Sequence, residues 1–189
     1  MSKANSHSSG QALGARFGWR VWPGAVSGDR LCRGGSACLF AGPHPLGQVG
    51  DGFGSADDHQ IASAWVAHPD APPLLLADDH LDLVGADSDV ALAVLDHLAD
   101  NAQLLCPVVM HIRAGFFLVA PDENLRWREM APRGRGITLP PWIPLPSESS
   151  IGHLVWQVPP TPTNAARLLT YGELADAFSA CLPKADFDE

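Results

Sequence analysis

The stretch PPLLLADDHLDLVGADSDVALAVLDHLAD, residues 72–100, decides the fold that this sequence predicts. Its apolar opening and the run over 81–87 predict two consecutive strands. From Asp89 onward, apolar residues recur about every 3.6 residues, which predicts a helix whose first turn is capped by Asp89. Two further apolar, β-rich runs follow at 104–110 and 115–120. The predicted order is therefore strand, strand, helix, strand, strand.

Carboxylates gather where these strands end and the helix begins, at Asp82, Asp87 and Asp89. The ends of strands in an α+β or mixed α/β sheet are where such folds hold a metal ion or a polar ligand. A simpler interpretation needs no metal, because aspartate is a preferred residue at the start of a helix. Both interpretations stay open for Asp87 and Asp89.

Length and composition indicate one compact domain. The 189 residues are 46% hydrophobic and 17% charged, which suits one substantial core and leaves too little chain for two large domains. We therefore expect a flexible N-terminal tail at 1–10, a single domain at 11–183 and an acidic tail at 184–189. The 18 glycines and 17 prolines predict short elements joined by turns and long loops.

No part of the sequence has the pattern of a membrane segment or a secretion signal. The apolar runs fall short of the roughly 20 residues that span a bilayer, and residues 1–10 contain no apolar run. We expect a soluble, cytoplasmic protein without membrane contact. The formal net charge of -9 argues against generic nucleic-acid binding, because the phosphate backbone attracts positive surfaces.

The positive charges are unevenly distributed. Five of the 12 basic residues lie in 113–135, and all five are arginines, which bind phosphate and carboxylate groups in a bidentate manner. One interpretation of this stretch is a solvated loop. The other is a surface for a nucleotide or single-stranded DNA, formed by Arg126, Arg128, Arg133 and Arg135.

A candidate zinc site lies in the region 24–55, which lacks helical or strand periodicity. A loop of this length in a compact domain is usually functional, tied down or disordered. Two thiolates and an imidazole could supply three of the four ligands of a structural zinc ion. These residues are Cys32, Cys38 and His44. The alternative is a loop with reduced thiols.

The remaining sequence predicts further regular elements. Residues 57–68 predict a helix capped by Asp57 or Asp58. A strand is expected over 151–158, where apolar and polar residues alternate. One amphipathic C-terminal helix is expected after capping residues at 161–164, with an apolar face that runs from Leu168 to Leu182.

Several short motifs, spread over 11–182, follow one another in a defined order. They are GWRVWP at 18–23, Cys32 and Cys38, GPHP at 42–45, IASAW at 61–65 with HPD at 68–70, a strand ending in acids, and WIPLPS at 142–147 with Gly152 and Trp156. In this order they resemble the N-terminal domain of bifunctional DNA primase/polymerases. That domain is the Prim-Pol branch of the archaeo-eukaryotic primase superfamily.

The resemblance implies an α+β fold with a palm-like, small mixed sheet and flanking helices. In the family, an Asp-x-Asp pair at a strand end holds two divalent cations, Mg2+ or Mn2+, which stabilise the attacking oxygen and the leaving pyrophosphate. A neighbouring strand with a Ser/Gly-x-His pattern contacts the incoming nucleotide. By this resemblance, the candidate catalytic residues are Asp82, Asp87 and Asp89, and the candidate nucleotide-binding residues are His111 and Arg113.

The sequence departs from the family at these positions. Aligned on the Asp-x-Asp pair, Gly85 stands at the first acid and Asp87 at the second, and the family's histidine falls on Gly115 or Phe116 rather than His111. We therefore expect a Prim-Pol-like protein of DNA replication type with little or no nucleotidyltransferase activity. Its expected partners are a nucleotide, single-stranded DNA or a replication protein. The alternative is an active, metal-dependent primase/polymerase.

Overall fold

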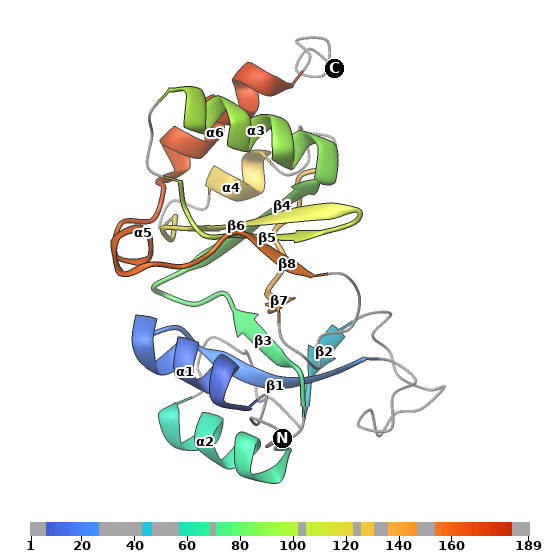
Figure 1. The fold of residues 1–189 in the computed structure, drawn as a ribbon, viewed down its shortest axis with the longest axis vertical. Helices are drawn as coiled ribbons and strands as arrows, with labels where there is room; N and C mark the ends of the chain where they lie inside the picture. Colours follow the sequence, from blue (N-terminus) through green and yellow to red (C-terminus); the bar gives the residue numbers. More distant parts are fainter. Residues whose placement is uncertain are drawn as a thin grey trace, which may run out of the picture. The chain divides into compact units, whose positions relative to one another are not determined.

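The structure is a computed structural model that describes residues 7–26, 43–46, 57–68, 71–101, 105–122, 126–130, 136–146 and 154–182. The chain divides into two compact units (Figure 1): unit 1 comprises 1–78 and 141–154, and unit 2 comprises 79–140 and 155–189. The single domain predicted for 11–183 stays a prediction, because compactness alone does not define a domain. Helix α1 (His7–Phe17) begins within the segment expected to be a tail.

Both units combine helices with a four-stranded sheet, which confirms the α+β class. The mixed sheet expected from the resemblance is not found in the part of the chain that the structure describes, where each strand ladder is antiparallel. Within the described ranges, parallel pairing is confined to an isolated bridge between Val119 and Leu169. None of the helices that the structure describes is long and apolar enough to cross a membrane.

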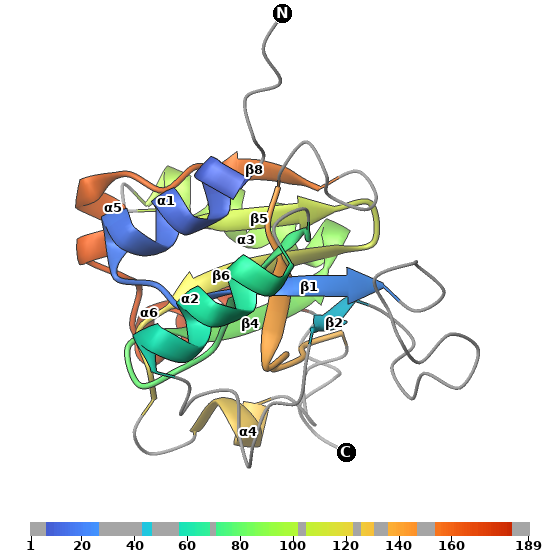
Figure 2. The ribbon, with the colours of Figure 1, turned by 90° about the horizontal axis from the view of Figure 1, so that it is seen from below.

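Unit 1 has a sheet of short strands. They are β1 (Val21–Val26), β2 (Pro43–Pro45), β3 (Pro73–Leu76) and β7 (Trp142–Pro144), in the order β2-β1-β3-β7. Helices α1 and α2 (Asp58–Ala67) pack against β1 (Figure 2). The Trp65 indole on α2 donates a hydrogen bond to the Val21 carbonyl at 2.9 Å, which fixes this packing.

The start of α2 confirms one of the two predicted caps. The Asp57 carboxylate accepts a hydrogen bond from the Gln60 N–H at 2.8 Å, and the Gln60 side chain accepts one from the Asp57 N–H at 2.9 Å. This capping box satisfies two backbone N–H groups that have no partner within the helix. The helix ends at Ala67 with His68 as its C-cap, at the place that the sequence predicted.

Unit 2 contains the elements from β4 onward, apart from β7. They are β4 (Asp82–Asp87), α3 (Ser88–Asp100), β5 (Val108–His111), β6 (Ala114–Val119), α4 (Arg126–Met130), β8 (Val155–Val158), α5 (Pro162–Ala166) and α6 (Tyr171–Cys181). The sheet order is β4-β6-β5-β8. Strands β4 and β5 are both antiparallel to β6, so they run parallel to each other and α3 connects them. Together with β3, these elements confirm the predicted order strand, strand, helix, strand, strand.

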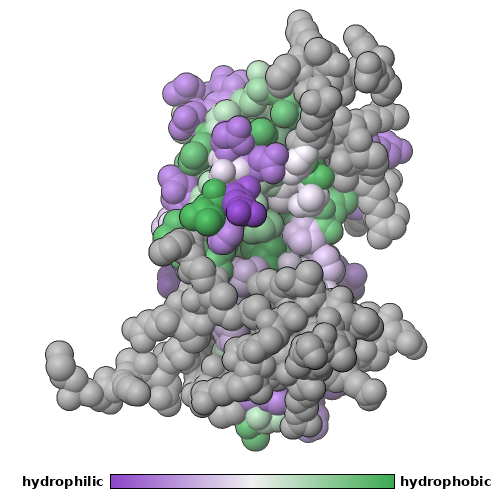
Figure 3. All heavy atoms as spheres, turned by 90° about the vertical axis from the view of Figure 1, so that its right-hand side faces the viewer, coloured by the Kyte–Doolittle hydropathy of each residue, from purple (hydrophilic) through white to green (hydrophobic). Residues whose placement is uncertain are grey.

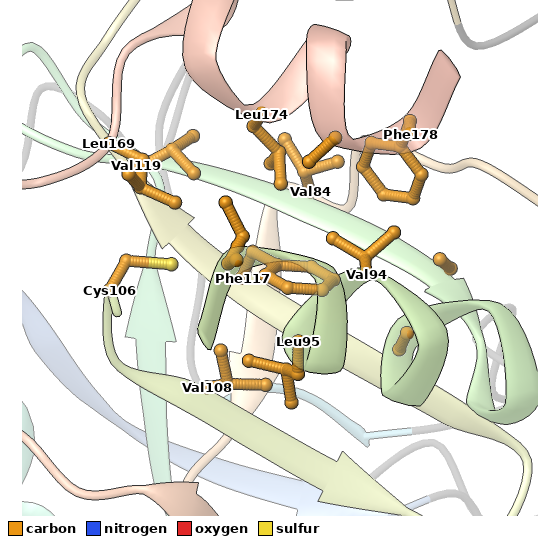
Figure 4. Packing of buried hydrophobic residues seen from close by; sticks show 14 of the residues in the cluster. Val84, Val94, Leu95, Cys106, Val108, Phe117, Val119, Leu169, Leu174 and Phe178 are labelled. Carbon is orange, nitrogen blue, oxygen red and sulfur yellow. The ribbon is translucent and has the colours of Figure 1, made fainter. Parts of the chain in front are cut away.

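Helices α3 and α6 cover one face of this sheet (Figures 1 and 4). Alternate residues of a strand point to the same face, and Val84 and Phe117 point toward the helices. The rings of Phe117 and Phe178 meet edge to face with centroids 5.7 Å apart. Gly85 and Asp87, which alternate with the core residues of β4, therefore lie on the opposite face of the sheet.

The start of α3 corrects the predicted cap. Strand β4 continues to Asp87, so the helix begins at Ser88, one residue before the predicted cap. Asp89 therefore lies inside the first turn instead of capping it. Asp87 occupies the N-cap position, and its side chain makes no capping hydrogen bond.

The predicted C-terminal helix is two helices. Thr161 starts α5 and Thr170 starts α6, each through a capping box. The chain leaves the helical conformation between them because the Leu169 carbonyl accepts a hydrogen bond from the Ala120 N–H at 2.9 Å. At the second cap, hydrogen bonds from the Thr170 N–H and hydroxyl hold the pKa of Glu173 below its ordinary value.

Candidate functional site

One end of the unit 2 sheet brings together residues from three segments. Strand β4 ends at Asp87, α3 begins there, and the turn of the β5–β6 hairpin is hydrogen-bonded to the first residue of α3. In the ladder, Asp87 pairs with Ala114, and Ala114 pairs with His111. Asp87 and His111 therefore lie in one row on the face opposite to α3, with their backbones about 10 Å apart.

Ser88 holds the hairpin turn against α3. Its N–H donates to the Arg113 carbonyl at 3.2 Å, and its hydroxyl donates to the Ile112 carbonyl at 3.3 Å. The Arg113 N–H donates to the His111 Nδ1 at 3.4 Å. The structure thus places four predicted site residues at the same end of the sheet, namely Asp87, Asp89, His111 and Arg113.

These four side chains offer two kinds of chemistry. The carboxylates of Asp87 and Asp89 are exposed oxygen ligands of the type that Mg2+ and Mn2+ prefer. The Arg113 guanidinium and the His111 imidazole can bind phosphate oxygens. A nucleoside triphosphate carrying a divalent cation would match both signs of charge.

Asp82 does not belong to this group. It begins β4 whereas Asp87 ends it, and five steps of a strand separate residues by about 17 Å. The Asp82 carboxylate accepts a hydrogen bond from the Asp122 N–H at 2.9 Å, at the other end of the sheet. The structure therefore does not bring Asp82 together with Asp87 and Asp89, and the catalytic role of these residues stays a prediction.

Gly85, the position of the family's first acid, is covered by Thr138. The two residues exchange backbone hydrogen bonds, from each N–H to the other carbonyl, both at 2.8 Å. A Cβ atom on Gly85 would lie 2.5 Å from the Thr138 Oγ1 and 3.2 Å from the Phe116 ring. Sequence reasoning did not identify Thr138. A glycine inside a strand was the available signal, because it often marks a close approach of another backbone.

The segment that leads to Thr138 also lies beside Asp87. Gly136 has φ +78, and a Cβ atom there would lie 2.5 Å from the Asp87 Oδ2. Only glycine combines this left-handed backbone with so little space. The chain from Gly136 to Thr138 therefore runs beside both positions of the Asp-x-Asp alignment.

Arg126 has intramolecular contacts at the other end of the sheet. Its Nε lies 3.3 Å from the Asp122 Oδ1, and its guanidinium lies over the Tyr171 ring at 4.4 Å. The Asp122 side chain is only 1% exposed, and its second oxygen accepts a hydrogen bond from the Trp127 N–H at 3.0 Å. Asp122 is a structural residue that the sequence did not single out. The Arg128 side chain, Arg133 and Arg135 lie outside what the structure describes.

The predicted zinc ligands cannot be compared with the structure. Cys32 and Cys38 lie outside the described residues, and only the backbone of His44 is described, in β2 opposite Ala25. Cys106 belongs to the core of unit 2, where burial raises the pKa of its thiol to about 12. Within the described ranges, no three His, Cys, Asp or Glu side chains form a group that could hold a metal ion. The zinc, Mg2+ and Mn2+ sites stay predictions.

The chain was also compared with known proteins. No family model, no curated protein and no solved structure matches it.

Proposed function

We propose that this chain is a primase/polymerase-like protein of DNA replication type with a degraded metal site. It uses the fold to bind a nucleotide or a replication partner, and it has little or no nucleotidyltransferase activity. The ordered motifs of the sequence, which resemble the Prim-Pol domain, support this function. The connection β4–α3–β5 with β6 between its strands supports a palm-like sheet, because it presents one strand end and one helix start at a single edge.

The contact between Gly85 and Thr138 is the observation that best supports a loss of catalysis. Two-metal phosphoryl transfer needs clustered carboxylates, because two cations must be held close together so that the pair stabilises the attacking and the leaving oxygen. At Gly85 no carboxylate is present, and the Thr138 hydroxyl occupies the space that a side chain would need. Asp82 is about 17 Å from Asp87 along β4 and cannot replace the missing acid.

Primer extension and dinucleotide synthesis on a single-stranded template with Mn2+ test this proposal directly. We expect no product from the wild type, and an unchanged result for Asp87→Asn. A folded protein that extends primers, and loses this activity in Asp87→Asn, would contradict the proposal and establish the active enzyme. Thermal unfolding of both proteins is the control, since an unfolded sample would give the same blank result.

The end of the sheet with Asp87 and His111 is the candidate nucleotide site. We expect a nucleoside triphosphate with Mg2+ to raise Tm by about 3–6 °C at ten times Kd. The triphosphate alone should have little effect, because the Asp87 and Asp89 carboxylates repel it. Differential scanning fluorimetry measures both cases.

Two variants and one control locate this binding. Asp87→Asn and His111→Ala should each reduce the shift with Mg2+ and triphosphate. The control Arg167→Ala changes an exposed arginine outside the site and should leave the shift intact. An equal shift without Mg2+, or one that survives both site variants, would place nucleotide binding elsewhere.

A further inference from the structure

Five residues form a small surface, which we call the hairpin patch; it shares Asp89 and Arg113 with this site, and all of its residues except the half-buried Ser88 are exposed. Ser88, Asp89 and Leu92 contribute from the first turns of α3, and Ile112 and Arg113 form the turn between β5 and β6. Residues three and four positions apart are neighbours on a helix surface, so Leu92 continues the patch one turn beyond Ser88 and Asp89. The Ser88 hydrogen bonds to the turn join the two parts.

The patch exposes apolar side chains at unusual positions. Ile112 is 64% exposed and Leu92 is 44% exposed, and few large hydrophobic side chains of the described chain are exposed to this degree. A two-residue hairpin turn normally carries Gly, Asn or Asp, whereas Ile-Arg stands here. A sequence that breaks a local rule without a packing reason points to a function for the side chains concerned.

The turn is also held in place before any partner binds. Both carbonyls of the turn, at Ile112 and Arg113, accept hydrogen bonds from Ser88. A fixed turn loses less conformational entropy on binding than a free loop. Ile112 thus has the properties of an anchor: a projecting apolar side chain on a rigid support.

The charges of the patch complement each other. Within the described residues, the Arg113 and Asp89 side chains form no ion pair and no hydrogen bond. The patch therefore offers one free cation and one free anion beside two apolar side chains. In a two-fold interface, a contact between residue i of one copy and residue j of the other is repeated as a contact between j and i, so a patch with one cation and one anion can pair with a second copy of itself. In such a pairing, Arg113 meets the second copy's aspartate, and Ile112 meets its leucine.

We infer that the hairpin patch is a self-association surface whose occupant is a second copy of this chain. The β5–β6 hairpin projects toward the right-hand side in Figure 1, and Figure 3, which views that side, shows hydrophobic and hydrophilic residues next to one another. Five side chains cover less than the roughly 800 Å² per partner of a stable interface. The dimer is therefore weak, and salt weakens it further because its ion pairs are exposed.

Sedimentation velocity of the full chain, from micromolar to near-millimolar concentration, tests this inference. We expect a concentration-dependent dimer in the wild type that weakens as salt is added. Ile112→Asp should abolish it while the turn still forms, because aspartate is favoured in turns. The matched control is Val66→Asp, which changes a side chain that is 83% exposed on α2 and should not affect the dimer.

Charge-reversal variants test whether Arg113 of one copy faces Asp89 of the other in the dimer. Arg113→Glu and Asp89→Arg should each raise the dimer Kd at least about tenfold, since each places like charges opposite each other twice. Mixing the two variants should restore dimers, because both contacts of a mixed pair then join opposite charges. Circular dichroism and Tm confirm that each variant is folded.

Three results would overturn the inference. They are a wild type that stays monomeric at near-millimolar concentration, a dimer that survives Ile112→Asp, and a mixture of the two charge variants that stays monomeric. Nucleotide is left out of every sample, so that the result does not depend on the proposed function.

Discussion

Gly85→Asp is expected to destabilise the protein by about 3–5 kcal/mol. The substitution places a carboxylate on a buried strand position, where the Thr138 Oγ1 would lie 2.5 Å from the new Cβ and the Phe116 ring 3.2 Å from it. Either the carboxylate loses its water, or the Thr138 segment loses its two backbone hydrogen bonds to Gly85. Urea unfolding followed by circular dichroism measures the loss.

Further variants separate the steric effect of a side chain at position 85 from the effect of its charge. Gly85→Ala adds only the Cβ and should cost about 1–3 kcal/mol, and Thr138→Ala removes the obstructing hydroxyl from an exposed residue at little cost. The double variant Gly85→Asp with Thr138→Ala should therefore be more stable than Gly85→Asp alone. The coupling free energy from this double-mutant cycle measures the obstruction itself. A cycle without coupling would mean that Thr138 moves aside freely.

The same double variant tests the origin of the degraded site. It would place two carboxylates, at 85 and 87, on one face of β4 with the obstructing hydroxyl removed. Mn2+ should then raise its Tm more than that of the wild type, and Asp87→Asn in the same background should remove the gain. If Mn2+ has no effect on the double variant, the missing acid is not the only difference from a metal site.

The sequence predicted those parts of the fold that local patterns determine. The order of strands and the helix within 72–121 follows from apolar runs and helical periodicity, and Asp57 could be predicted as a cap from its position before an apolar helix. The C-terminal region shows where such patterns fail. Its periodicity suits one helix, but pairing of Leu169 with a distant strand interrupts it. The split into two antiparallel sheets likewise depends on strand pairing that no local pattern encodes.

The candidate site was predictable only in part. Asp87 was identified from its place at a strand end and His111 from the family resemblance, and strand register brings them into one row. Asp82 and Asp87 lie at opposite ends of β4. Their closeness in the sequence had suggested one cluster of acids. The residue that packs over Gly85 is Thr138, which lies far along the chain. A glycine inside a strand indicated that another backbone comes close, but the sequence did not identify which one.

Asp122→Ala is expected to cost about 2–4 kcal/mol. The Asp122 carboxylate is 1% exposed and accepts hydrogen bonds from the Trp127 N–H at 3.0 Å and the Arg126 Nε at 3.3 Å. Its removal leaves a buried N–H at the start of α4 without an acceptor. The loss stays below that of a fully buried ion pair, because the Arg126 side chain is 49% exposed and can regain water.

Two variants separate the roles of Asp122 and Arg126. Asp122→Asn keeps an acceptor oxygen for the Trp127 N–H and should cost less than Asp122→Ala. Arg126→Ala removes the ion pair and the contact with Tyr171, whose cation–π part contributes about 0.5–1 kcal/mol. A loss below about 1 kcal/mol for Asp122→Ala would show that α4 does not depend on this carboxylate.

The same series decides between the two interpretations of Arg126. Asp122 and Tyr171 hold the guanidinium in the folded protein, so single-stranded DNA must compete with both for it. If Arg126 binds phosphate, Asp122→Ala should release it and strengthen binding at low salt, and Arg126→Ala should weaken binding. Fluorescence anisotropy with labelled single-stranded DNA measures both. If neither variant changes binding while both change stability, Arg126 serves the fold of unit 2 alone.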